Sequence, residues 1–196
     1  REDIQLAEWF SGNAMGPGDD QIINDILSGK ESQYLDLISW KNEEEFEKRF
    51  EAALIDELRL TDINDTKTFN TTLGSSEDGK WYNSSNKANY FDIEPSINKV
   101  DDWQILSPVR DKLFGVSALN RKIHKQFRQN RIDYCSGKLK QNKFEKVRLP
   151  KPLGTEEIVY GAKVINLSNH KRNKVYPEGG LDYIANGEIG LVVGQY

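Results

Sequence analysis

Apolar residues at helical spacing mark the beginning of the chain. Residues 4–10 predict a short amphipathic helix, and residues 22–27 predict a second one. Asp19 or Asp20 is a suitable N-cap for the second helix, and Gly29 is suited to end it. We therefore expect the chain to open with two short helices.

A strand and a longer helix are predicted next. Residues 34–40 alternate loosely between apolar and polar side chains, which is typical of a strand. Asn42 is a suitable N-cap for the clearest helix of the chain, and the glutamates that follow it favour the positive end of the helix dipole. We expect these glutamates to form a solvated helix start rather than a metal site. The apolar face of this helix consists of Phe46, Phe50, Ala53, Leu54 and Leu58.

The middle of the chain changes character twice. Residues 61–102 are rich in Asn, Ser, Thr and Asp, which predicts an insertion with little regular structure. Residues 103–107 predict a buried strand that stops at Ser107-Pro108, and residues 115–129 predict a helix with one apolar side and several cationic ones. The aromatic anchors expected in the insertion are Phe69, Trp81, Tyr82, Tyr90 and Phe91.

The last part of the chain predicts β structure. A Lys-rich connector covers residues 130–157, and three apolar runs follow at residues 158–160, 163–167 and 188–193. Asn186-Gly187 precedes the last run, and Asn-Gly between apolar runs is a strong hairpin signal. We expect a small antiparallel β unit, distinct from the preceding α/β part.

The charge balance changes sign along the chain. The 196 residues carry a net charge of −4. Residues 1–102 hold 10 Lys and Arg against 23 Asp and Glu, a balance of −13, whereas residues 103–196 hold 17 against 8, a balance of +9. A basic half in an acidic protein favours a face that meets a polyanion. Neutralisation of the two halves across an internal interface explains the same counts, and charge alone leaves both interpretations open.

The composition argues against a membrane-spanning, a secreted or a disulfide-bonded protein. No apolar run approaches the roughly 18 residues of a membrane helix, so we expect no membrane partner. The acidic N-terminus lacks a signal-peptide pattern, and the single Cys135 forms no internal disulfide, which fits a cytoplasmic location. The chain does not begin with Met, and we expect it to be a portion of a larger protein.

Candidate catalytic motifs are weak. Residues 74–80 match the spacing G-x-x-x-x-G-K of a phosphate loop, but Trp81 stands where a hydroxyl must reach Mg²⁺, and two acidic residues inside the loop would repel phosphates. His124 and His170 lack Cys or carboxylate partners at metal-ligand spacing. We therefore predict no metal site and no catalytic residue.

Two segments resemble patterns of RecD-type superfamily 1 DNA helicases. Residues 103–128 contain Trp-Gln-Ile-Leu-Ser-Pro-Val-Arg and then Gly-Val-Ser-Ala-Leu-Asn, similar to the family's Q-V-L-S-P-M-R and G-x-x-x-L-N. Residues 158–165, Asn169 and residues 184–190 follow in the order of the family's G-D-K-V-M, N and V-F-N-G-D-I-G. Ala162 replaces the Asp of that second pattern.

The resemblance implies a fold class and boundaries. The fold would be α/β: part of the second RecA-like domain of a P-loop NTPase, with a sheet and flanking helices, and the start of an SH3-like β barrel. Residues 1–60 would lead into this domain, 61–102 would be the insertion, 103–150 would hold its strand, basic helix and connector, and 151–196 the incomplete barrel. The parent helicase would use ATP and Mg²⁺ together with its first RecA-like domain. This chain carries no Walker A or B motif, so we expect it to be inactive alone.

Single-stranded DNA is the expected partner. Cations on the predicted basic helix suit phosphate contacts. The resemblance also implies that Ser107, Arg110 and Asn120 line a nucleotide- or DNA-facing edge, with the Asn186-Gly187 turn near the strand. The expected contact residues are Ser107, Arg110, Asn120, Arg121, Lys122, Lys125, Asn186 and Gly187. The alternative is a non-catalytic module that binds protein through an SH3-like β unit, and for each residue a purely structural role stays open.

Overall fold

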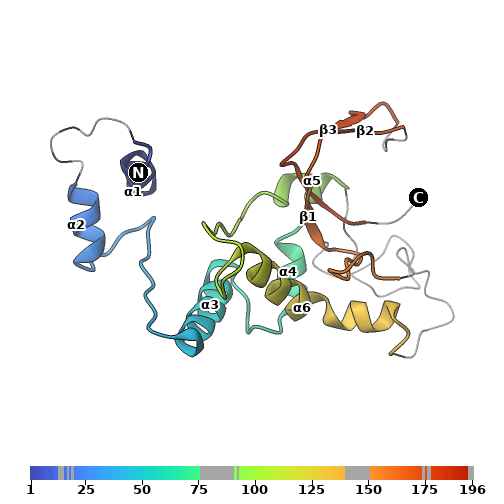
Figure 1. The fold of residues 1–196 in the computed structure, drawn as a ribbon, viewed down its shortest axis with the longest axis horizontal. Helices are drawn as coiled ribbons and strands as arrows, with labels where there is room; N and C mark the ends of the chain where they lie inside the picture. The colour runs from blue at the N-terminus through green and yellow to red at the C-terminus, as the bar shows by residue number, and fades with distance from the viewer. Residues whose placement is uncertain are drawn as a thin grey trace. The chain divides into compact units, whose positions relative to one another are not determined.

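The computed structural model describes residues 1–12, 16, 18, 20–75, 91, 93–139, 151–173, 175 and 178–193. These residues form six helices and two small antiparallel sheets, which confirms a mixed helical and β architecture. The chain divides into two compact units, Arg1–Phe50 and Glu51–Tyr196, each of which is described by itself (Figure 1).

The first unit opens with the two predicted helices, α1 (Glu2–Phe10) and α2 (Gln21–Leu27). Asp20 is the N-cap residue of α2, but its carboxylate accepts a hydrogen bond from Trp9 Nε1 at 3.2 Å and does not cap the helix. Asp19 lies outside the described residues. The strand predicted at residues 34–40 is wrong, because a strand needs a neighbour for its backbone groups and none pairs with this described segment.

Helix α3 (Glu43–Glu57) begins where the sequence predicts. Asn42 Oδ1 accepts a hydrogen bond from the Glu45 N–H at 2.9 Å, and Glu45 Oε2 accepts one from the Lys41 N–H at 2.9 Å. The first of these bonds satisfies a backbone donor of the first turn, and the second ties the residue before the cap to the same turn. Leu54 of its apolar face and Leu58, which directly follows the helix, are buried, as the spacing predicts.

The expectation of an irregular insertion at residues 61–102 is wrong for its described part. Helices α4 (Thr66–Thr71) and α5 (Ile93–Lys99) occur there, and Asp65 caps α4 by accepting a hydrogen bond from the Thr68 N–H at 3.0 Å. Phe69 and Phe91 are buried anchors, as predicted. The other expected anchors, Trp81, Tyr82 and Tyr90, lie outside the described residues.

The buried strand predicted at residues 103–107 is also wrong. The segment is irregular, and Ile105 and Leu106 are 38% and 86% exposed. Trp103 anchors it instead: Nε1 donates a hydrogen bond to Thr72 Oγ1 at 3.1 Å, and the indole packs edge-on against Phe69. The segment is therefore held in place by the packing of Trp103 and not by pairing in a sheet.

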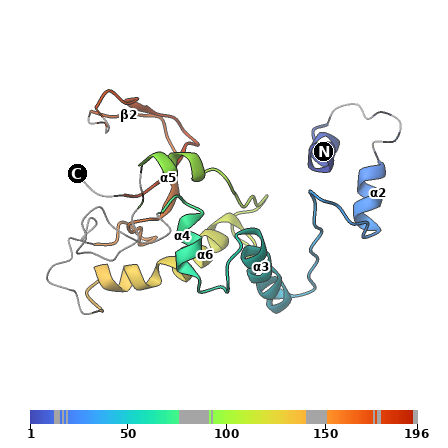
Figure 2. The same ribbon diagram turned by 180° about the vertical axis from the view of Figure 1, so that it is seen from behind.

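The basic helix is confirmed and is longer than predicted. Helix α6 (Val116–Cys135) includes the first six residues of the expected connector, whose residues 140–150 lie outside the described part. Its buried residues include Phe127, which stacks on Phe69 of α4 with ring centroids 3.7 Å apart. Helices α4 and α6 accordingly lie side by side in both views (Figures 1 and 2).

The predicted antiparallel β unit is a two-stranded ribbon. Strand β1 (Lys163–Ile165) pairs with β4 (Ile189–Leu191), and β2 (His170–Lys171) pairs with β3 (Tyr183–Ile184). The Asn186-Gly187 turn joins β3 to β4, whose partners differ, so the predicted hairpin at this turn is wrong. The run at residues 158–160 contributes only an isolated bridge, from Ile158 to Leu153.

Candidate nucleic-acid interface

Arg121 on α6 has a carboxylate partner within the chain. Its Nε and Nη2 atoms donate hydrogen bonds to the two oxygens of Glu156 at 3.1 and 3.0 Å. This bidentate contact raises the pKa of Arg121 and lowers the pKa of Glu156. The charges of His124 and Lys125 lower the Glu156 pKa further. One predicted phosphate contact is thus occupied by a carboxylate.

The other two cations predicted on α6 differ from each other. Lys122 Nζ lies 3.2 Å from Glu51 Oε1, so Lys122 also has an internal carboxylate partner. Lys125 is exposed and forms none of the ion pairs found among the described residues. Of the three predicted cations, Lys125 is the one whose charge is most available to solvent.

Ser107 and Arg110 belong to the loop that leads into α6. Ser107 Oγ donates a hydrogen bond to the Phe114 carbonyl oxygen at 2.8 Å and accepts one from the Val109 N–H at 3.3 Å, so its hydroxyl closes the loop. A Cβ atom on Gly115 would lie 2.3 Å from the Arg110 carbonyl oxygen. Gly115 therefore permits a close backbone approach here, while the Arg110 side chain is exposed.

Asn186 and Gly187, the predicted contact residues of the ribbon, stabilise the bend between its two strand pairs. The Asn186 N–H donates a hydrogen bond to Asn169 Oδ1, and the Gly187 N–H donates one to the Asn166 carbonyl oxygen, both at 2.8 Å. Gly187 has a φ of 93°, which favours glycine. Asn166 is not among the residues predicted from the sequence, although its Nδ2 lies within hydrogen-bond distance of the carbonyl oxygens of Ser168, Ile184 and Ala185. The available signal was its polar side chain, which interrupts the apolar run at residues 163–167.

The two segments that resemble the helicase patterns contact each other. Lys163 Nζ donates a hydrogen bond to the Trp103 carbonyl oxygen at 2.7 Å and lies 4.4 Å from the centroid of the indole ring. Arg128 donates hydrogen bonds to the Gly161 carbonyl oxygen from Nε at 3.1 Å and from Nη2 at 2.6 Å. Burial lowers the pKa of Lys163 below its usual range and that of Arg128 to about 10.

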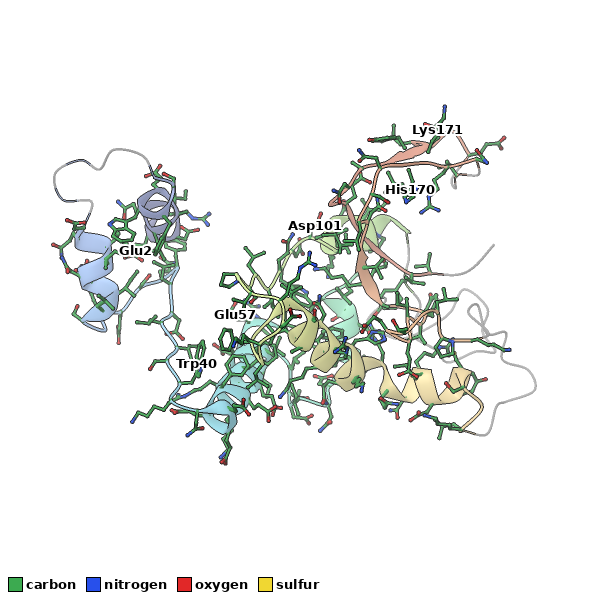
Figure 3. The ribbon with its side chains drawn as sticks, viewed as in Figure 1. Glu2, Trp40, Glu57, Asp101, His170 and Lys171 are labelled. Atoms are coloured by element: carbon green, nitrogen blue, oxygen red, sulfur yellow. The ribbon has the colours of Figure 1, made fainter. Side chains whose placement is uncertain are left out.

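The predicted contact residues form two groups that no described hydrogen bond or ion pair joins. Arg110, Asn120 and Lys125 are exposed on α6 and its preceding loop, whereas Asn186 and Gly187 are exposed on the ribbon. Figure 3 shows His170 and Lys171 farther along this ribbon, on β2.

The described residues form no phosphate loop or metal cluster. Gly74, the first residue of the G-x-x-x-x-G-K spacing, allows a backbone contact: a Cβ atom there would lie 2.5 Å from Ser96 Cα. Most of that spacing, residues 76–80, lies outside the described part. No group of three or more His, Cys, Asp or Glu residues suited to a metal occurs in the described part.

Among the described residues, none of the helices combines the length and the apolar character that a membrane crossing requires. No family model matches the chain, and comparison with curated proteins and with solved structures yields no significant match.

Proposed function

We propose that this chain contributes a single-stranded-DNA contact surface to an ATP-dependent helicase. In this proposal it forms part of the second RecA-like motor domain, with the start of an SH3-like barrel in its β ribbon. The observation that carries the proposal is the contact between the two helicase-like segments. Trp103 and Lys163 are 60 positions apart and yet touch, and Arg128 binds Gly161. Segments of one module are expected to pack in this way.

Two glycines of the resemblance support the same proposal. Gly115 permits the close approach of the Arg110 carbonyl oxygen, and Gly161 has a φ of 82° and lies against Phe91. Both positions need a residue without Cβ, because a side chain would collide with neighbouring atoms. These are structural requirements that a module sharing the helicase patterns would also have to meet.

The proposed contact surface is narrower than the sequence alone predicts. We define the exposed cationic set as Arg110, Lys112 and Lys125, whose side chains form none of the described ion pairs. Exposed guanidinium and ammonium groups of this kind bind phosphate oxygens. Arg121 and Lys122 would join the surface only by exchanging their carboxylate partners for phosphates, which makes their contribution smaller.

ATP and Mg²⁺ belong to this proposal only through the parent helicase. The described residues offer neither a phosphate cradle nor a cluster of carboxylates for the ion. We therefore assign the nucleotide site and the first RecA-like domain to other parts of that protein. The role of this chain is to bind and position the strand.

The test is the salt dependence of binding to a fluorescein-labelled oligothymidine, followed by fluorescence anisotropy. Binding is expected to weaken steeply as salt rises. Changing Arg110, Lys112 and Lys125 together to Ala should reduce the slope of log affinity against log salt by about 0.7 per lost phosphate contact. Changing Lys30, Lys48 and Arg49 of the first unit to Ala removes the same net charge from residues that are paired with carboxylates, and this control should leave the slope unchanged. Salt-independent binding, or an unchanged slope in the first variant, would refute the proposal.

A protein-binding module is the second candidate function, and the internal ion pairs favour it. Arg121 with Glu156 and Lys122 with Glu51 show that part of the basic half neutralises acidic residues of the same chain. This candidate predicts no affinity for the oligothymidine at any salt concentration. The same anisotropy experiment therefore distinguishes the two candidates.

A further inference from the structure

Residues 34–40, between α2 and α3, form an extended segment of the first unit (Figure 1). We call this stretch the open segment. Within the described part of the chain, no hydrogen bond reaches the backbone N–H or C=O groups of residues 36–39. Extended backbone with unpaired N–H and C=O groups is the edge to which a further strand can add. The sequence pattern of a strand is therefore present here without a second strand to pair with it.

Contacts within the first unit hold both ends of the open segment. At its start, Ser32 Oγ accepts hydrogen bonds from the N–H groups of Tyr34 and Leu35, both at 3.0 Å. At its end, the ring of Trp40 packs edge-on against Phe46 of α3, with centroids 5.0 Å apart. A segment that is fixed at both ends loses less conformational freedom when a partner binds its middle.

The side chains of the open segment alternate between two faces, as they do along any extended backbone. Leu35 and Leu37 share one face, and the Leu37 side chain is 60% exposed. Asp36 is on the opposite face, is exposed, and forms none of the ion pairs found among the described residues. An added strand would thus place apolar side chains beside Leu37 and a side chain of opposite charge beside Asp36, which is a stabilising cross-strand pair.

The charge of the first unit indicates which kind of strand would bind. Residues 1–50 hold 5 Lys and Arg against 12 Asp and Glu, a balance of −7. Two copies of so acidic a unit repel each other, whereas a basic partner is attracted to it. Charge complementarity therefore favours a basic strand over a second copy of this chain.

We propose that the open segment binds a basic segment of a partner protein, in which Lys or Arg alternates with apolar residues, by adding it as a β-strand. Backbone hydrogen bonds to residues 36–39 provide affinity, and the alternating side chains provide specificity. The inference does not depend on the proposed helicase role, because it uses none of the residues of the exposed cationic set.

Fluorescence anisotropy of the whole chain with a labelled peptide of alternating Lys and Val tests the proposal. Two control peptides separate its parts. One carries N-methyl groups on two adjacent central residues, which blocks both edges of the peptide strand, and the other alternates Glu with Val. We expect each control to bind at least about tenfold more weakly than the first peptide. Equal binding of the N-methylated peptide would show attraction by charge alone and would overturn the proposal, as would equal binding of the acidic peptide.

A charge reversal in the open segment tests its location. Asp36→Lys should weaken binding of the Lys-Val peptide by about tenfold, because it places like charges opposite each other. Glu57→Lys makes the same change of net charge at an exposed position at the far end of α3 and should have a much smaller effect. Equal losses in the two variants would overturn the assignment to this segment.

Hydrogen exchange of the unchanged protein gives a test that needs no variant to fold. Successive N–H groups of a strand point to opposite edges, so a strand added at one edge protects every second amide. With the Lys-Val peptide bound, the slowed amides should be those of Asp36 and Ile38, or those of Leu37 and Ser39, but not both pairs. Protection of all four amides, or of none, would overturn the proposal. Alternating protection that appears without peptide as the protein concentration rises would also overturn it and would identify a second copy as the partner.

Discussion

Arg128 directs two hydrogen bonds at the carbonyl oxygen of Gly161, 33 positions later in the chain. A third goes to Asn70 Oδ1 at 2.8 Å, and the guanidinium carbon lies 5.3 Å from the ring centroid of Phe69. One buried side chain thereby ties α6 to α4 and to the start of the β ribbon. The packing of the second unit depends on this arginine.

Arg128→Met should destabilise the protein by about 3 kcal/mol. The substitution keeps a long apolar stem, but it leaves the Gly161 carbonyl and the Asn70 amide oxygen buried without their donor. Urea unfolding followed by tryptophan fluorescence measures the change. Arg121→Met is the control and should cost less than about 1 kcal/mol, because the Arg121–Glu156 pair is exposed. Equal effects of the two substitutions would contradict this assignment.

Gly161→Ala should destabilise the protein by about 3 kcal/mol, and Gly154→Ala by about 1 kcal/mol. Both glycines have positive φ, of 82° and 66°. A Cβ atom on Gly161 would lie 2.7 Å from Phe91 Cε2, whereas one on Gly154 would meet nothing within 4 Å. Both variants carry the backbone strain of a positive φ, but only Gly161→Ala adds the close contact with Phe91. The difference between their thermal unfolding curves therefore measures the cost of that contact. Similar losses at both positions would show that Phe91 moves aside.

Asn166→Asp should loosen the middle of the ribbon. The new carboxylate lacks the Nδ2 donors and stands near three carbonyl oxygens, which repel it. Hydrogen exchange of the Gly187 amide, which is bonded to the Asn166 carbonyl oxygen, should accelerate by about tenfold. Asn173→Asp, an exposed change on the same ribbon, should leave that rate as it is. Unchanged exchange in Asn166→Asp would mean that the backbone alone holds the bend.

The unfolding free energy of the protein should decrease at acid pH because Asp65, the cap of α4, becomes protonated. Hydrogen bonds from the Thr68 and Thr61 backbone N–H groups hold the pKa of this carboxyl well below its usual range. A group whose native pKa is lowered contributes stability above its unfolded pKa of about 3.9, and that contribution is lost as pH falls below this value. The unfolding free energy should therefore decrease as the pH is lowered below about 3.9. Asp65→Asn should flatten the dependence, whereas Glu57→Gln, at an exposed position, should not.

Glu156→Gln should strengthen binding of the oligothymidine roughly threefold at low salt, because it releases Arg121 and removes a negative charge beside Lys125. Glu57→Gln changes the net charge by the same amount away from this ion pair and serves as the control. Anisotropy titrations measure both. Equal gains in the two variants would indicate an effect of net charge alone.

Local signals predict helices α1, α2, α3 and α6, whereas α4 and α5 lie in the segment predicted to be irregular. The cap at Asn42, the spacing of Leu54 and Leu58, and the apolar side of α6 are all visible in the sequence, because helical hydrogen bonds join residues four positions apart. The antiparallel β structure near the end is likewise predictable from its apolar runs. For the candidate site, the sequence identifies the basic helix and the exposed side chains of Arg110 and Lys125.

Tertiary contacts decide what the sequence leaves open. Residues 103–107 have the composition of a buried strand, but a strand forms only where a distant segment offers matching backbone groups, and here Trp103 packs on Phe69 instead. The carboxylate partners of Arg121 and Lys122 are also remote in the sequence. Which carboxylate forms the ion pair depends on which one the fold brings within reach. Periodicity, capping and charge are local properties that the chain itself determines; pairing and burial exist only once remote segments meet.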